Sequence, residues 1–160
     1  MFKSDADTIT DIRKGGDFTL VKDIKATKDI TLTKDTNLNL DGHTLSAVGG
    51  NYGDNIVIGN GANVVISNGQ IPKADLGDLG YQSATIIVKT AYESHLTLNN
   101  TKVTGIYPVY LNSANENSTV TINSGEYYSS YADNPAVYVG KGSSSSTTGG
   151  KVTIYGGTFG

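Results

Sequence analysis

Cysteine is absent from this sequence, which excludes disulfide bonds, thiolate metal sites and cysteine nucleophiles. Arginine occurs only once, as Arg13, and the formal net charge is −3, so the composition argues against nucleic-acid binding. All apolar runs are much shorter than the roughly 18 residues that a membrane-spanning helix needs. The N-terminus, MFKSDADTITDIRK, also lacks the apolar middle of a secretory signal, so we expect synthesis in a cytoplasm and no membrane partner.

The 160 residues do contain enough Leu, Ile and Val, spread over the whole length, to close one hydrophobic core. We therefore expect one folded domain over residues 17–160, preceded by an N-terminal cap over residues 1–16. In this cap, a short amphipathic helix with Asp5 or Asp7 as its N-cap would end before Gly15.

One eight-residue pattern recurs along the chain. Each copy has an apolar residue, any residue and a second apolar residue, then four residues rich in Asn, Gly, Asp and Thr, then one more apolar residue. The copies are LNLDGHTL at 38–45, VVISNGQI at 64–71, LTLNNTKV at 96–103, VTINSGEY at 120–127 and VTIYGGTF at 152–159. Short apolar phrases lie between them: IVI at 56–58, IIV at 86–88, VYL at 109–111 and VYV at 137–139. Constant patterns at variable spacing predict a stacked repeat whose loops differ in length.

Short strands without helical segments between them predict a parallel β-solenoid, in which equivalent strands of successive coils pair. Residues two apart in a strand lie on one face, so the apolar positions should form inward columns. The columns would be Leu38, Val64, Leu96, Val120 and Val152; then Leu40, Ile66, Leu98, Ile122 and Ile154; then Leu45, Ile71, Val103, Tyr127 and Phe159. The Asn- and Gly-rich turns, such as 67–69 and 99–101, should stack too, with left-handed backbone and laddered side-chain amides.

The segment ITLTKDTNLNLDGHTL at 30–45, with VVISNGQI and VTINSGEY, resembles the right-handed parallel β-helices of the pectin-lyase-like superfamily, especially those of phage structural proteins and bacterial surface proteins. The resemblance covers residues 17–160 and implies an all-β, right-handed, single-stranded parallel β-helix of about five coils. It says little about activity, because the superfamily includes lyases, hydrolases, tailspikes, fibres and adhesins. The chain stops inside its repeat, so we expect either a fragment of a longer solenoid or a last coil covered by a partner chain.

Carboxylates are dispersed in the sequence, whereas lyases of this superfamily cluster them for calcium and use an arginine as base. His43 and His95 fall at different repeat positions, and we expect both to be solvent-exposed turn residues. Asp75 and Asp78 lack the regular ligand spacing of a calcium loop. We therefore expect no catalytic residue, no metal and no cofactor; observed cleavage would direct attention to Asp75, Asp78 and Asp133.

The middle residues of the apolar phrases should point outward and form one exposed column. This column consists of Val57, Ile87, Tyr110 and Tyr138. Because an exposed apolar patch of this kind usually marks a partner surface, we expect the column to lie in an interface between subunits, with a homotrimer favoured. The alternative is coverage by the chain's own long turns at 72–85 or 128–136.

Tyrosine is concentrated late in the chain, with seven of the 10 tyrosines between residues 107 and 155. Tyrosine together with Asn and Ser is typical of rigid amphipathic contact surfaces for sugars and proteins. We therefore expect ligand binding through Tyr128, Tyr131 and Tyr138, with a host surface glycan as the hypothetical ligand.

The sequence thus favours a non-catalytic virion component, namely a phage head fibre, decoration protein or tail appendage that contacts other virion proteins and the host surface. A fragment of a bacterial cell-surface adhesin is an alternative on the same scaffold. A polysaccharide depolymerase with an active site between subunits is another. An upstream signal peptide would favour the adhesin, and release of reducing sugars would favour the depolymerase.

Overall fold

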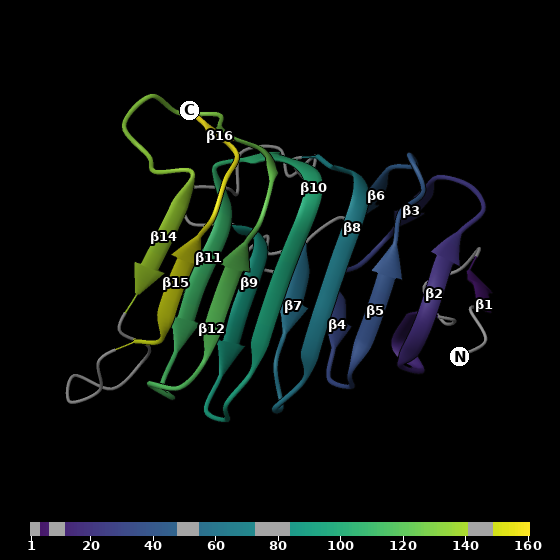
Figure 1. Ribbon diagram of the computed structural model, residues 1–160, viewed down its shortest axis with the longest axis horizontal. Coiled ribbons are helices and arrows are strands. Elements are labelled where there is room, and N and C mark those ends of the chain that lie inside the picture. The colour runs from purple at the N-terminus through teal and green to yellow at the C-terminus, as the bar shows by residue number, and fades with distance from the viewer. Residues whose placement is uncertain (1–3, 7–11, 48–54, 73–83, 141–148) are drawn as a thin grey trace.

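The computed structural model describes residues 4–6, 12–47, 55–72, 84–140 and 149–160. Their strands fall into three sheets of nine, five and two strands, and all pairings between them are parallel. Figure 1 shows the nine-stranded sheet running across the molecule in front of the five-stranded sheet. An all-β chain of stacked parallel sheets is confirmed, and this arrangement is compatible with a parallel β-helix. The described part contains no helix long and apolar enough to cross a membrane.

Equivalent strands of successive coils become neighbours in these sheets. The nine-stranded sheet has the order β1 (Ser4–Ala6), β2 (Gly16–Leu20), β5 (Thr36–Asn39), β8 (Asn63–Ile71), β10 (His95–Gly105), β12 (Thr119–Ile122) and β15 (Lys151–Ile154), with β13 (Gly125–Ser129) paired to β10 and to β16 (Thr158–Phe159). The five-stranded sheet contains β4 (Ile30–Leu32), β7 (Ile56–Ile58), β9 (Ala84–Thr90), β11 (Tyr107–Ser113) and β14 (Val137–Gly140). The two-stranded sheet pairs β3 (Ile24–Ala26) with β6 (Leu45–Ala47).

The predicted pairing of the middle coils is confirmed. Leu98 of β10 lies opposite Ile66 on one side and Ile122 on the other, and all three side chains are fully buried. The third column is also in register, with consecutive partners Ile71, Val103, Tyr127 and Phe159. Alternation along each strand turns these apolar side chains toward the space between the sheets, so the core is a stack of aligned columns.

The first coil departs from the predicted register by two residues. β5 places Leu38, rather than Leu40, opposite Ile66. The expected register returns where Thr44 pairs with Gln70, so the turn after β5 is two residues longer than its counterpart in β8. A register shift of two residues keeps each side chain on the same face of the strand, so Leu38 stays buried. Leu40 is buried as well, within the longer turn.

The ends of the stack differ from its middle. Ile154 lies opposite Ile122, in the predicted column, but it is 48% exposed, because β15 is the last strand along the nine-stranded sheet and no described strand pairs beyond it. Asp5 was predicted to cap a helix, yet it lies in β1, which covers the free edge of β2. In the remainder of the predicted cap, Ile12 and Arg13 have helical backbone and Ile12 is fully buried. Asp7 lies outside the described residues.

Side-chain amides connect the stacked turns, as predicted. Asn68 Nδ2 donates a hydrogen bond to Asn39 Oδ1, and Asn100 Nδ2 donates to Asn68 Oδ1, both at 3.2 Å. Beside this ladder, Asn123 Nδ2 donates to Asn99 Oδ1 at 2.6 Å. Asn68 and Asn100 have φ angles of 63° and 49°, in the left-handed region that Asn tolerates better than most residues. The ladder therefore lies where successive coils bend in the same way.

Candidate functional site

Three tyrosine rings form a cluster on the outward face of the five-stranded sheet. Tyr107 and Tyr110 come from β11, and Tyr138 of β14 lies opposite Tyr110 in the ladder. The ring centroids are 4.9 Å apart for Tyr110 and Tyr138, 5.7 Å for Tyr107 and Tyr138, and 6.1 Å for Tyr107 and Tyr110. The closest pair meets edge to face at 65°, an arrangement that aromatic rings prefer. We call these three residues the tyrosine cluster.

The tyrosine cluster presents a supported ring to solvent. Tyr138 is 42% exposed, whereas Tyr107 and Tyr110, whose rings contact it, are half-buried. Both strands are held by parallel pairing, so the rings have a fixed relative position. Ring faces of this kind pack on apolar ligand surfaces, while the phenol hydroxyls donate and accept hydrogen bonds.

Tyr107 was not among the residues predicted to bind a ligand. Regular alternation would place residues 107 and 110 on opposite faces of a strand. In the structure, Pro108 and Val109 are both buried, so the alternation is interrupted and both tyrosines lie on the outward face. Proline commonly disturbs a strand in this way, and Pro108 is the sequence signal that could have indicated the interruption.

The predicted outward column is in register, but its exposure varies. Its members Val57, Ile87, Tyr110 and Tyr138 are consecutive partners. Ile87 is only 3% exposed, so the prediction that it faces solvent is wrong. It lies between Val57 and Tyr110 in the ladder, and both of these neighbours are themselves half-buried. Tyr138, at 42%, is therefore the most exposed member of the column, and a subunit interface there stays a prediction.

The predicted ligand residues Tyr128, Tyr131 and Tyr138 do not form one cluster. Among the described aromatic pairs, Tyr138 contacts rings of β11 and neither Tyr128 nor Tyr131. Tyr131 is 51% exposed in the turn after β13. Tyr128 lies in β13, where its hydroxyl donates to Glu126 Oε1 at 3.0 Å, and this bond raises the pKa of Tyr128. Their part in binding stays a prediction.

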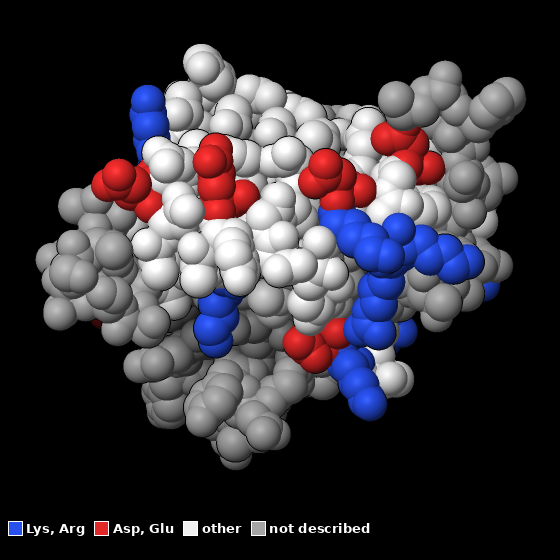
Figure 2. All heavy atoms as spheres, turned by 90° about the horizontal axis from the view of Figure 1, so that it is seen from below, with Lys and Arg blue, Asp and Glu red and all other residues white. Residues whose placement is uncertain are grey.

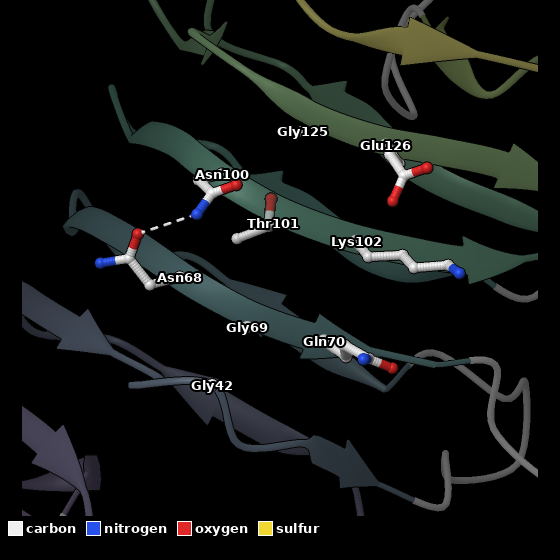
Figure 3. A pocket seen from close by; sticks show the side chains of 9 residues that line it. All are labelled: Gly42, Asn68, Gly69, Gln70, Asn100, Thr101, Lys102, Gly125 and Glu126. Atoms are coloured by element: carbon white, nitrogen blue, oxygen red, sulfur yellow. Dashed lines mark hydrogen bonds between the residues drawn. The ribbon is translucent and has the colours of Figure 1, made fainter.

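A shallow groove with a volume of about 290 Å³ lies over the stacked turns (Figure 3). Its lining residues are Gly42, Asn68, Gly69, Gln70, Asn100, Thr101, Lys102, Gly125 and Glu126. Figure 3 shows the asparagines on one side of the groove, the longer side chains on the other, and Gly69, Thr101 and Gly125 between them. Gly125 is required by packing between coils, because its φ is 118° and a Cβ there would meet the carbonyl oxygen of Thr101. The groove offers hydrogen-bonding groups at the spacing of the coils.

The histidines have structural partners. His95 begins β10, and its Nδ1 hydrogen-bonds Thr119 Oγ1 of β12 at 2.6 Å, while Nε2 hydrogen-bonds Glu93 Oε1 at 3.0 Å. The prediction of a turn residue is therefore wrong for His95, which is 33% exposed and links two coils. His43 lies in a turn, as predicted, with Nδ1 3.4 Å from Asp23 Oδ1.

The described residues contain no group of three or more His, Cys, Asp or Glu side chains that could hold a metal ion. Asp133 is exposed in the turn after β13. Asp75 and Asp78 lie outside the described residues.

No protein-family model matches this chain, and neither a curated protein nor a solved structure does. A function must therefore be argued from the surfaces of the molecule and from the resemblance of its repeats.

Proposed function

We propose that this chain is a non-catalytic structural and adhesion component of a phage virion, a head fibre, decoration protein or tail appendage, that contacts the host surface. One observation carries the adhesive part of this proposal. The tyrosine cluster holds three rings in mutual contact on an outward face, with Tyr138 42% exposed. Rings held in place by paired strands lose little conformational entropy when a ligand binds.

A right-handed, pectin-lyase-like β-helix is the scaffold that we propose for this role. The stacked parallel sheets support it, as does the resemblance of segments 30–45 and 120–127 to the β-helices of phage structural proteins. In such a scaffold each coil contacts only its neighbours, so side chains on its faces repeat at the strand spacing of about 4.8 Å. A ligand with a repeating chain fits this regularity.

A host surface glycan is the ligand class that we propose for the tyrosine cluster. The C–H faces of a sugar pack on aromatic rings, and sugar hydroxyls find partners in the phenol groups. No charged side chain is needed for such a contact, so binding should change little with ionic strength. Tyr131, 51% exposed, would add a further contact only if the ligand extends beyond the cluster.

Association into a homotrimer through the outward column is a further part of this proposal. Because Ile87 is buried, Tyr138 would supply most of the contact, and a glycan bound there would lie at a boundary between subunits. Sedimentation equilibrium tests the assembly with Tyr138→Lys, since a lysine at Ile87 would instead be buried in the subunit itself. A monomeric wild-type chain at high concentration would contradict this part alone.

The adhesive function is tested by binding to a panel of purified bacterial cell-surface polysaccharides. Tyr138→Ala should weaken binding about tenfold or more, because truncation of a central aromatic contact usually costs this much. Tyr138→Phe, which keeps the ring, should retain most of the affinity. The matched control is Tyr92→Ala, which removes a 64% exposed tyrosine from a turn outside the cluster. Equal binding by wild type and Tyr138→Ala would contradict the proposal, and release of reducing ends would favour the depolymerase.

A further inference from the structure

Basic residues are concentrated in the first coils. Six of the 12 Lys and Arg residues lie between Arg13 and Lys34, a span that also contains Asp17, Asp23 and Asp29, so its formal net charge is +3 whereas that of the whole chain is −3. Figure 2 shows Lys and Arg side chains gathered at one end of the face that it presents, on the side where Figure 1 places β2. The acidic side chains of that face are spread along it. The positive charge is therefore local.

Part of this charge surrounds a cavity with a volume of about 270 Å³. The cavity is lined by Arg13, Lys25, Ala26, Thr27 and Lys28, and we call it the basic cavity. Lys25 points outward because its neighbours in β3, Ile24 and Ala26, are buried. Arg13 reaches the cavity from the preceding segment, where its Nη2 donates to the backbone carbonyl of Asp29 at 2.9 Å.

The three cations of the basic cavity have no carboxylate partner in the described part of the chain. Among the described residues, His43 lies 3.4 Å from Asp23 and His95 hydrogen-bonds Glu93, and neither contact involves Arg13, Lys25 or Lys28. The nearby carboxylate of Asp29 accepts from the Thr31 hydroxyl at 3.4 Å. Arginine carries five N–H donors, of which the Asp29 carbonyl takes one, so most of the guanidinium fork remains available. Three cations that line one hollow without an ion pair favour a ligand of opposite charge.

We propose that the basic cavity binds a sulfate or phosphate group carried by an acidic polysaccharide. The arginine fork matches the geometry of such an oxyanion, and the two lysines supply further charge. A polysaccharide is favoured over nucleic acid because the chain is acidic overall and the cavity is compact, whereas nucleic-acid surfaces track many phosphates. The cavity lies beside β3, apart from the β11 and β14 strands of the tyrosine cluster. It therefore adds a second contact, which depends on charge, to the proposed function.

Calorimetric titration of the full chain with a sulfated glycosaminoglycan hexasaccharide, and with a neutral dextran of equal length, tests this site. Wild type should bind the sulfated probe and not the neutral one. Binding of the sulfated probe should be weaker at about 300 mM NaCl than at about 50 mM NaCl. The double variant Lys25→Gln/Lys28→Gln should bind about tenfold more weakly or worse, since two charged hydrogen-bond donors are lost. The control Lys89→Gln/Lys151→Gln removes the same charge from exposed lysines elsewhere and should change affinity less than about twofold.

Several results would overturn the proposal: no binding of the sulfated probe, an equal loss in both double variants, or equally tight binding of duplex DNA of the same charge. Displacement by inorganic sulfate at an equal concentration of charge would assign the cavity to a free anion and overturn the polysaccharide. Tyr138→Ala should leave this titration unchanged. The charge-dependent contact and the aromatic contact of the proposed function can therefore fail separately.

Discussion

Replacing Tyr127 by Phe should destabilise the fold even though the ring stays in place. Tyr127 is fully buried in the third column, and its ring stacks on Phe159 at 5.2 Å. Its hydroxyl donates to the carbonyl of Ser124 at 2.8 Å and hydrogen-bonds Thr101 Oγ1 at 2.9 Å. Without that hydroxyl, Thr101 Oγ1 is left buried and unpaired. We expect the free energy of unfolding to fall by about 1–3 kcal/mol, and Tm to fall by about 2–4 °C per kcal/mol at this chain length.

The same side chain makes stability depend on alkaline pH. Burial raises the pKa of Tyr127 above its ordinary value of 10.0, and the hydrogen bond with Thr101 opposes this rise. A pKa that is higher in the folded state than in the unfolded state gives a contribution that is complete below the unfolded pKa. The contribution is lost as the pH rises through the folded pKa. Wild type should therefore lose stability above pH about 10 more steeply than Tyr127→Phe.

Urea denaturation of wild type, Tyr127→Phe, Thr101→Val and the double variant measures both effects. The loss in free energy of unfolding of the double variant should be smaller than the sum of the losses of the two single variants, because each single variant breaks the same hydrogen bond. Unchanged stability of Tyr127→Phe at neutral pH, together with additive single losses, would refute the assigned hydrogen bonds.

Two matched pairs test the packing. Gly125→Ala should cost at least about 2 kcal/mol more than Gly42→Ala, because both glycines have positive φ but a Cβ meets the Thr101 backbone only at Gly125. Equal losses of Tm would contradict the close approach. Ile122→Asp should cost more than about 4 kcal/mol and leave no cooperative unfolding by circular dichroism, whereas Ile154→Asp, in the same column but 48% exposed, should fold. If both variants fold equally well, the inward column is wrongly assigned.

The middle of the stack could be predicted from the sequence because the two-residue period of the strands and the eight-residue repeat indicate the same buried positions there. Apolar residues two apart in each copy determine the buried face, and constant spacing within a copy aligns Ile66, Leu98 and Ile122. The register of the first coil could not be predicted in this way. Leu38 and Leu40 are both apolar and share a face, so only the length of the following turn distinguishes the two registers.

The surface was less predictable than the core. The ladder neighbours of Ile87 follow from the sequence, but its 3% exposure does not follow from strand alternation, since Ile86 and Val88 beside it in β9 are buried too. Tyr107 reaches the tyrosine cluster through an irregularity at Pro108 that strand periodicity does not include. The basic cavity joins Arg13 with Lys25 and Lys28, which only the arrangement of the first coils brings together.

Aromatic proton–carbon NMR during titration with a cell-surface polysaccharide that the chain binds tests whether the tyrosine cluster is the binding site, because the rings of the cluster and of other tyrosines are observed in one spectrum. We expect the signals of Tyr107, Tyr110 and Tyr138 to shift with saturation, while those of the exposed Tyr92 and Tyr155 do not. Saturating shifts at Tyr92 or Tyr155 with none in the tyrosine cluster would contradict it.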